Sequence, residues 1–319
     1  MNGTIKDLMP ISNYPNGFAE GVNIRGMPLL SSYPGKVFWV SSTTGSNGNA
    51  GTFDRPWSTI DYAIGRCTAS KGDIIVVKPG HIETVTAAGG IALDVAGVAI
   101  IGLGVGSIRP TVNFTTAVGA SVAVTAANCT IINVLFTGGV DALTNPISVA
   151  AADFALLECE WRDVTGQATD VVLTTAAADR MYIRGLRYDG ATAAGTNAGI
   201  AIVGGDRIVI EGLRMDGNFA VGGVDIRTTA TTDIEVRDVV FRTRNAADVF
   251  MIDTVTASTG IIGPDIYMQL ADNAANFAGS INGATFVYHN PISIVNLAGE
   301  IGAQINASVA GFKTASTNA

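Results

Sequence analysis

One pattern of apolar positions recurs five times along the middle of the chain. In each copy a large apolar residue follows smaller apolar residues that stand two and five positions earlier. The large residues are Phe136, Trp161, Tyr188, Met215 and Phe241, at intervals of 25, 27, 27 and 26 residues. The two most similar copies, RMYIRGLRYDG (180–190) and RIVIEGLRMDG (207–217), match at seven of eleven positions. This regularity indicates an internal repeat.

Each repeat predicts two or three short strands and no helix. A second, shorter alternation of apolar and small or polar residues precedes each copy, as in SVAVTA (121–126), DVVLTT (170–175) and GVDIRT (223–228). Helical periodicity is absent from this region. The residue three positions before the large apolar one is of a type that suits a tight bend. These bend residues are Asn133, Glu158, Gly185, Gly212 and Asp238.

Short strands at a constant spacing of about 25 residues predict a right-handed parallel β-helix, an all-β fold. A leucine-rich repeat would need a Leu/Asn consensus that this chain lacks, and a propeller blade needs about 40 residues. In a β-helix each coil buries its inward side chains against the next coil, about 4.8 Å away. A continuous apolar column is therefore expected.

Residues 48–85 (GNAGTFDRPWSTIDYAIGRCTASKGDIIVVKPGHIETV) resemble the opening coil of the pectate-lyase-like β-helix superfamily. The matching positions are Gly51-Thr52, Pro56-Trp57, Thr59-Ile60, Ala63, Gly72-Asp73, Ile74 to Val77, Pro79-Gly80 and Glu83. The resemblance implies that Ser58 to Cys67 form a helix covering the open end of the column. It is not specific for activity, because the superfamily includes lyases, hydrolases, phage tailspikes and non-enzymatic virion proteins.

The pattern divides the chain into three parts. Residues 1–47 do not repeat and are expected to be an attachment arm, and residues 48–270 are expected to form the capped β-helix. Residues 271–319 are almost free of charge, since only Glu300 and Lys313 are ionised between Asn273 and Ala319, and they are expected to close the column or pack against other subunits.

Composition excludes several classes of partner. The net charge of −8 disfavours nucleic acid and anionic membrane surfaces, and charged residues are only 14% of the chain against about 25% usually. The apolar stretch 90–108 contains Asp94 and five glycines, so buried strands explain it better than a membrane span. Cys67, Cys129 and Cys159 have neither a disulfide framework nor metal-ligand spacing. We therefore expect no cofactor and no metal.

The best catalytic candidates are Asp189 and Asp216, which occupy the same position on successive coils. Asp163 stands one residue later on the coil before. Two outward carboxylates one coil apart would be about 5 Å from each other, the spacing that retaining glycosidases use. Ca²⁺ binding is a further possibility for such carboxylates.

A surface charge ladder is the alternative explanation for these carboxylates, and we favour it. Arg187 and Arg214 lie two residues before the aspartates, while Arg162 and Arg242 stand at the same position on the flanking coils. Alternating charges of this kind relieve repulsion between stacked rows. The sequence therefore predicts no catalytic residue, with Asp163, Asp189 and Asp216 as the candidates if there is one.

The remaining chemistry is sparse. A pectate-lyase mechanism needs a basic proton acceptor and clustered acids for Ca²⁺, but no lysine occurs between Lys78 and Lys313. His81, in KPGHIE, is expected to be an exposed turn residue, and it has no Ser or Cys partner at a recognisable elbow. Trp39 is left without an assigned role, although its strand suits the first strand of the core.

The resemblance, the Ala/Thr/Gly-rich coils and the unpatterned arms together imply a bacteriophage virion protein. The function expected first is a non-enzymatic, homotrimeric capsid decoration (cement) protein, anchored to the major capsid protein through residues 1–47. The alternative is a tailspike or tail-fibre domain that binds host surface polysaccharide, with or without cleaving it. A secreted polysaccharide lyase is a third class. MNGTIKDLMP lacks the features of a signal peptide, so we expect synthesis in the host cytoplasm and assembly on the capsid exterior.

Overall fold

The computed structural model describes residues 23–24, 27–28, 35–163, 170–190, 196–243, 249–255, 257–269, 281–282, 285–295 and 301–302. The predicted arm (1–47) and C-terminal segment (271–319) lie largely outside these residues. Near the N-terminus, β1 (Asn23–Ile24) and β2 (Met27–Pro28) pair in antiparallel orientation.

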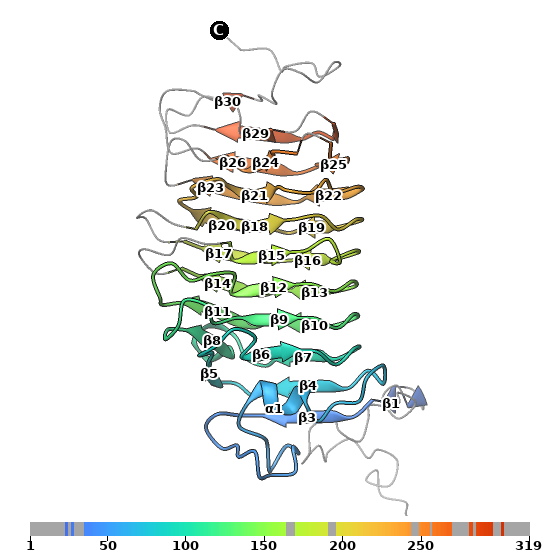
Figure 1. Ribbon diagram of the computed structural model, residues 1–319, viewed down its shortest axis with the longest axis vertical. Coiled ribbons are helices and arrows are strands. Elements are labelled where there is room, and N and C mark those ends of the chain that lie inside the picture. Colours follow the sequence, from blue (N-terminus) through green and yellow to red (C-terminus); the bar gives the residue numbers. More distant parts are fainter. Residues whose placement is uncertain are drawn as a thin grey trace, which may run out of the picture.

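Three sheets run along the length of the molecule, and successive coils stack like the steps of a column (Figure 1). Sheet 1 contains β3 (Val37–Val40), β4 (Ile74–Val77), β7 (Ala99–Gly102), β10 (Thr130–Ile132), β13 (Ala155–Leu157), β16 (Tyr182–Arg184), β19 (Val209–Glu211), β22 (Ile234–Arg237), β25 (Gly260–Ile262) and β28 (Phe286–Tyr288). Sheet 2 contains β5 (Ile82–Thr84), β8 (Thr111–Phe114), β11 (Leu135–Gly138), β14 (Glu160–Arg162), β17 (Arg187–Asp189), β20 (Arg214–Gly217), β23 (Val239–Thr243), β26 (Ile266–Gln269), β29 (Ile292–Val295) and β30 (Ile301–Gly302). Sheet 3 contains β6 (Ile91–Leu93), β9 (Val122–Val124), β12 (Ile147–Val149), β15 (Val172–Thr174), β18 (Ala198–Ile202), β21 (Gly222–Ile226), β24 (Met251–Asp253) and β27 (Ile281–Asn282).

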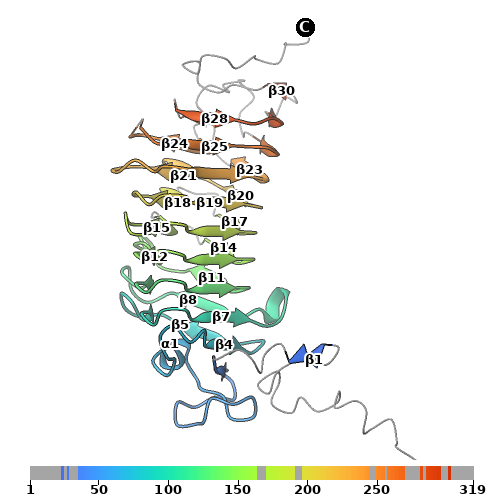
Figure 2. The ribbon, with the colours of Figure 1, turned by 90° about the vertical axis from the view of Figure 1, so that its right-hand side faces the viewer.

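Within each sheet every strand pairs in parallel with the strand one coil away, except for the antiparallel pair β29–β30. The predicted right-handed parallel β-helix is confirmed. Strand β3 and strands β28 and β29 extend the stack beyond the expected limits of 48 and 270. A view turned by 90° about the long axis shows the same stack of coils from the side, with α1 near its lower end (Figure 2).

The five large residues of the repeat fill the interior beneath sheet 2. Phe136 pairs with Trp161, Trp161 with Tyr188, Tyr188 with Met215 and Met215 with Phe241 across adjacent strands. All five are buried, none being more than 3% exposed. The predicted register is therefore confirmed, because strand side chains alternate between the interior and the outer face.

The predicted bend residues make the corner between sheets 1 and 2. Asn133, Glu158, Gly185, Gly212 and Asp238 all have positive φ, between 49° and 67°. Asn133 also donates its side-chain amide to the carbonyl oxygens of Gly102 and Gly104, at 2.8 and 2.9 Å. Small and Asx-type residues tolerate this left-handed conformation best, although Glu158 adopts it too.

The predicted cap is present and shorter than expected. Helix α1 spans Ile60–Ile64, begins at the Thr59 cap and buries Ile60, Ala63 and Ile64. The Asp61 carboxylate accepts the backbone N–H of Ala92 in β6 at 3.0 Å, and α1 thus occupies the open edge of sheet 3. The edge that would otherwise expose unpaired backbone groups is covered.

His81 corrects a sequence-based expectation. It is fully buried rather than exposed, and its Nε2 lies 3.1 Å from the Glu83 carboxylate. The neighbouring Ile82 is the exposed residue, because the chain enters β5 with Ile82 on the outer face and with its neighbours turned inward. Trp39 in β3 is 4% exposed, and its ring meets Phe53 edge-on at 5.0 Å.

Candidate functional site

The outer face of sheet 2 carries two rows of polar side chains. The first row contains Glu160, Arg187 and Arg214, which are in register on β14, β17 and β20. The second row, two residues further along each strand, runs through Arg162, Asp189, Asp216 and Arg242. Both rows follow from strand alternation, because the buried large residues stand between them.

Asp189 and Asp216 are brought together as predicted. They pair directly across β17 and β20, so their Cα atoms are separated by the inter-strand distance of about 4.8 Å. Asp189 is exposed and Asp216 is partly buried. Arg162 stands in register with Asp189 on one flanking strand, and Arg242 stands in register with Asp216 on the other, also as predicted.

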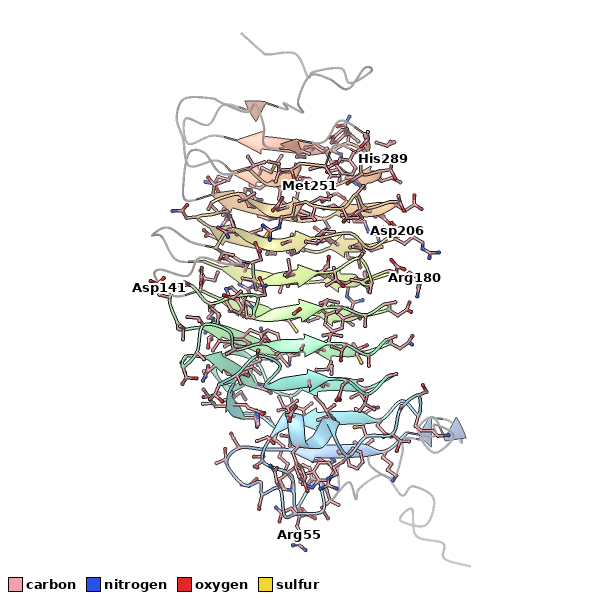
Figure 3. The ribbon with its side chains drawn as sticks, viewed as in Figure 1. Arg55, Asp141, Arg180, Asp206, Met251 and His289 are labelled. Carbon is pink, nitrogen blue, oxygen red and sulfur yellow. The ribbon has the colours of Figure 1, made fainter. Side chains whose placement is uncertain are left out.

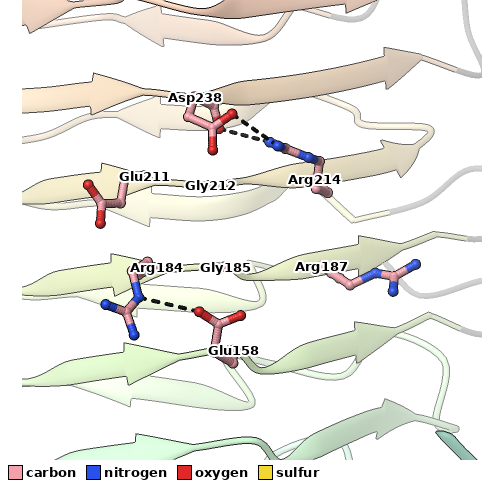
Figure 4. Close-up of a pocket in the computed structure, with 8 residues that line it drawn as sticks. All are labelled: Glu158, Arg184, Gly185, Arg187, Glu211, Gly212, Arg214 and Asp238. Carbon is pink, nitrogen blue, oxygen red and sulfur yellow. Dashed lines mark hydrogen bonds and ion pairs between the residues drawn. The ribbon is translucent and has the colours of Figure 1, made fainter.

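Two hollows lie side by side on this surface. The first, which we call the groove, has a volume of about 680 Å³ and lies over sheet 2. It is lined by Glu160, Arg187, Tyr188, Asp189, Arg214, Met215, Asp216, Val240 and Arg242. The second, the corner pocket, has a volume of about 520 Å³ and lies at the bend between sheets 1 and 2 (Figure 4). Arg187 and Arg214 line both hollows.

Asp163 is not part of the groove lining. Its Oδ2 lies 3.0 Å from both the Tyr188 hydroxyl and the Thr196 hydroxyl, and those two hydroxyls are 2.7 Å apart. Tyr188 and Thr196 are buried, at 3% and 1% exposed. Asp163 therefore anchors a buried polar cluster where the chain leaves sheet 2, and the structure separates it from the other two candidates.

Glu160 is a groove residue that the sequence reasoning missed. Its carboxylate accepts from Arg109 Nη1 at 2.9 Å and from Arg162 Nε at 2.6 Å. Arg162, which stands in register with Asp189, is thus engaged by Glu160 on its own strand. The available signal was the spacing of two residues between Glu160 and Arg162, which places both on one face of a strand.

The wall of the corner pocket is a network of ion pairs. Glu211 accepts from the Tyr182 hydroxyl and from Arg237 Nε, the latter at 2.8 Å. The hydrogen bond from Tyr182, and then Arg237, lower the pKa of Glu211 below its usual value. Burial, and then Glu211 itself, raise the pKa of Tyr182. This carboxylate is therefore held ionised and already satisfied.

A second acidic cluster lies on sheet 3 and was also missed. Asp225 in β21 is 1% exposed, and its carboxylate is 3.3 Å from Arg227, which also pairs with Asp170. Burial raises the pKa of Asp225, against the opposing effect of Arg227.

Among the described residues no group of three His, Cys, Asp or Glu side chains is arranged to hold a metal ion. In the same part of the chain, no helix is long and apolar enough to cross a membrane.

Comparison with known proteins shows the fold. No protein family model matches the chain, and no curated protein matches it. A solved chain of a GH136 lacto-N-biosidase from Eubacterium ramulus superposes with a TM-score of 0.55 at 14% identity, over 83% of this chain and 56% of that one. A rhamnogalacturonan lyase gives a TM-score of 0.48 at 13% identity, over 87% and 86% of the two chains. The selenomethionine derivative of the lacto-N-biosidase gives 0.48 at 12% identity.

The similarity to the native lacto-N-biosidase chain corrects one expectation. The protein spans a little over half of the native lacto-N-biosidase chain, and at 14% identity the likeness establishes the shared β-helix. Because that β-helix belongs to a glycoside hydrolase, the expectation of a non-enzymatic protein does not stand. The fold alone does not specify an activity, because one fold supports many chemistries through different site residues.

Proposed function

We propose that this protein is a glycan-binding β-helix domain of the tailspike or tail-fibre kind, which hydrolyses a host surface polysaccharide in the groove. The observation that carries the proposal is the in-register pair Asp189 and Asp216, which lies within a polar hollow of about 680 Å³. A retaining glycosidase needs two carboxyl groups about 5–5.5 Å apart, and neighbouring coils offer that separation.

The proposed reaction is a double displacement. One aspartate attacks the anomeric carbon while the other donates a proton to the departing glycosidic oxygen, so that the glycosidic bond breaks and a glycosyl ester forms. The second aspartate, now ionised, then takes a proton from water, which attacks the anomeric carbon and releases the first aspartate. Glu160, Arg187 and Arg214 offer acceptors and donors for sugar hydroxyl groups along the groove.

The groove is open and crosses several coils, which favours a bound chain over a single small molecule. Its lining comes from β14, β17, β20 and β23, which stack along the column axis. A polysaccharide lying along the axis would meet the same kind of side chain at each coil. Residues 1–47 as the attachment arm, a homotrimer and a location on the virion belong to the same proposal.

The test is a depolymerisation assay with the full-length protein and a panel of bacterial surface polysaccharides. Release of new reducing ends is expected with the wild-type protein and should fall by at least about a thousandfold in Asp189→Asn and in Asp216→Asn. Asp141→Asn serves as the matched control, because Asp141 is exposed and outside both hollows (Figure 3). Azide should rescue the nucleophile variant as a glycosyl azide of inverted configuration.

The proposal is wrong if the double variant Asp189→Asn/Asp216→Asn cleaves as fast as wild type. Mass measurement by light scattering tests the trimer, and immunogold labelling of phage particles tests the virion location. A monomer that labels no particle would remove those two parts and leave the hydrolysis to be judged by its own assay.

A further inference from the structure

The corner pocket is a gap in a row of polar side chains. Five bend residues stack at this corner, and three of them carry polar side chains: Asn133, Glu158 and Asp238. Gly185 and Gly212, on two adjacent coils between Glu158 and Asp238, carry none, and they form the floor of the pocket. The left-handed bend does not itself require glycine, because Glu158 adopts it with φ of 52°. Gly212 therefore leaves space that the backbone alone does not demand, whereas the Glu158 carboxylate occupies the space above Gly185, with its Oε2 2.5 Å from where a Cβ would stand.

The carboxylates around the pocket are each matched by a cation. Glu158 pairs with Arg184 at 3.3 Å, and Asp238 pairs with Arg214 at 2.9 Å (Figure 4). Glu211, the third, is satisfied by Arg237 from outside the pocket. Since each carboxylate already has its arginine, these pairs leave no negative charge for a further cation in the pocket.

Of the three arginines that line the corner pocket, Arg184 and Arg214 are paired with carboxylates and Arg187 is not. Its side chain makes no hydrogen bond or ion pair with any residue that the structure describes, and Figure 4 shows it extended beside the pocket without a partner. Glu160 stands in register on the preceding strand but is engaged by Arg109 and Arg162. On the following strand the in-register residue is Arg214, and like charges directly opposite each other are unfavourable.

An anion at this position would relieve that repulsion and would find its donors on Arg187, while Arg214, whose Nη groups donate to Asp238 and to the Leu213 carbonyl oxygen, adds its positive charge. Arginine presents a planar fork of N–H groups that matches carboxylate, sulfate or phosphate oxygens. We propose that the corner pocket binds an oxyanion, held by Arg187 with support from Arg214, and that this oxyanion is a substituent of the glycan in the adjoining groove. The second part rests on the proposed function, whereas the oxyanion site itself does not.

The experiment measures binding by calorimetry at low ionic strength to the double variant Asp189→Asn/Asp216→Asn, which excludes turnover. The probes are inorganic sulfate, methyl glucuronide as a sugar-borne carboxylate, and methyl glucoside as the neutral control. Both anions should bind, the glucuronide more tightly, and the glucoside should bind at least about tenfold more weakly than the glucuronide. With a net charge of −8, the protein does not attract anions in general.

Two variants test the pocket. Arg187→Ala should weaken both anions by at least about tenfold, the loss of one charge-assisted contact. Gly212→Asn fills the gap with the side chain that Asn133 carries at the same bend, and it should weaken them similarly. Its Cβ would lie 3.2 Å from the Gly185 nitrogen, so a small shift is needed, and Arg187→Ala does not depend on that shift.

The matched control is Arg180→Ala. Arg180 is an exposed arginine paired with Asp153 at the other edge of sheet 1, where it projects from the column (Figure 3). It should leave the binding of both anions unchanged.

The remaining outcomes distinguish the oxyanion site, the sugar-borne source of the anion and the proposed hydrolysis from one another. Equal binding of glucoside and glucuronide, or unchanged binding in Arg187→Ala, would overturn the oxyanion site. Sulfate binding without any preference for the glucuronide would overturn the sugar-borne source and point to a free anion. Failure of wild-type hydrolysis with intact anion binding would remove the proposed function and leave the oxyanion site standing.

Discussion

The sequence grouped Asp163 with the catalytic candidates Asp189 and Asp216, whereas the structure gives its carboxylate a stabilising role in a buried polar cluster. The perturbation is Asp163→Ala, which removes the carboxylate that lies 3.0 Å from the hydroxyls of Tyr188 and Thr196. Both hydroxyls are buried, so water cannot easily replace the lost acceptor.

The magnitude follows from that cluster. The hydroxyl groups of Tyr188 and Thr196 have one proton each to donate, and three short contacts join them to each other and to Asp163. In Asp163→Ala the two hydroxyl groups can still hydrogen-bond to each other across 2.7 Å. One hydrogen bond to a charged acceptor is lost outright, which costs about 1.5–3 kcal/mol when the donor stays buried. Asp163 is itself partly exposed, so we expect a loss of about 2 kcal/mol in the free energy of unfolding, and a melting temperature lower by about 4 °C.

The assay compares urea unfolding and glycan hydrolysis for Asp163→Ala and for Tyr188→Phe. Tyr188→Phe keeps the ring in the column and the Thr196–Asp163 contact, so it should cost only about 1 kcal/mol. The double variant should be less destabilised than the sum of the two single variants, because both remove the same interaction. Hydrolysis by Asp163→Ala at a temperature where it is folded should stay within a few-fold of wild type.

The reasoning fails if Asp163→Ala unfolds at the wild-type urea concentration while hydrolysis is abolished. That result would return Asp163 to the catalytic set. It would also mean that the contacts with Tyr188 and Thr196 are too weak to matter for stability.

Three further predictions concern the column. Trp161→Ala should lower the free energy of unfolding by about 3–5 kcal/mol in urea, because its ring is 1% exposed within the stacked core; a cost below 1 kcal/mol would contradict the stacking. Burial raises the pKa of Asp225 above its ordinary 3.8, so the folded state keeps this proton to higher pH than the unfolded state, and stability declines as pH rises through the folded pKa. Asp225→Asn lacks that decline, so its urea midpoint relative to wild type should be higher at pH 7 than at pH 4. A relative midpoint that is lower at pH 7 than at pH 4 would refute the raised pKa of Asp225. Burial raises the pKa of both Cys67 and Cys159 to about 12, so a thiol reagent at pH 8 should react slowly with native protein and fully after unfolding; rapid native labelling would show that these sites are open.

The repeat spacing was enough to predict the column and much of its register. Side chains alternate along a strand, so the positions of Phe136, Trp161 and Tyr188 also established which neighbours face outward. The bend residues were recognisable for the same local reason, since Asn, Asp and Gly tolerate positive φ. The same register places Asp189 opposite Asp216 on the adjacent strand, and it places each aspartate opposite an arginine on the strand beyond.

Local alternation does not say what covers the outer face of a strand. Asp225 lies on the outer face of sheet 3 and is nevertheless buried, with Arg227 linking it to Asp170, which is 55 residues earlier in the chain. His81 and Asp163 stand just outside their strands, where the chain turns and the alternation no longer determines direction.

The sequence by itself therefore determined the coil, its interior and the two rows of charge on sheet 2, because these depend on strand period and repeat length alone. Only the tertiary structure decided which charges are already satisfied. It joined Arg162 to Glu160, enclosed Asp163 with two hydroxyls, and left Arg187 beside a gap floored by two glycines. Side-chain pairing across coils depends on which rotamers the neighbours leave open, and a one-dimensional pattern does not contain that information.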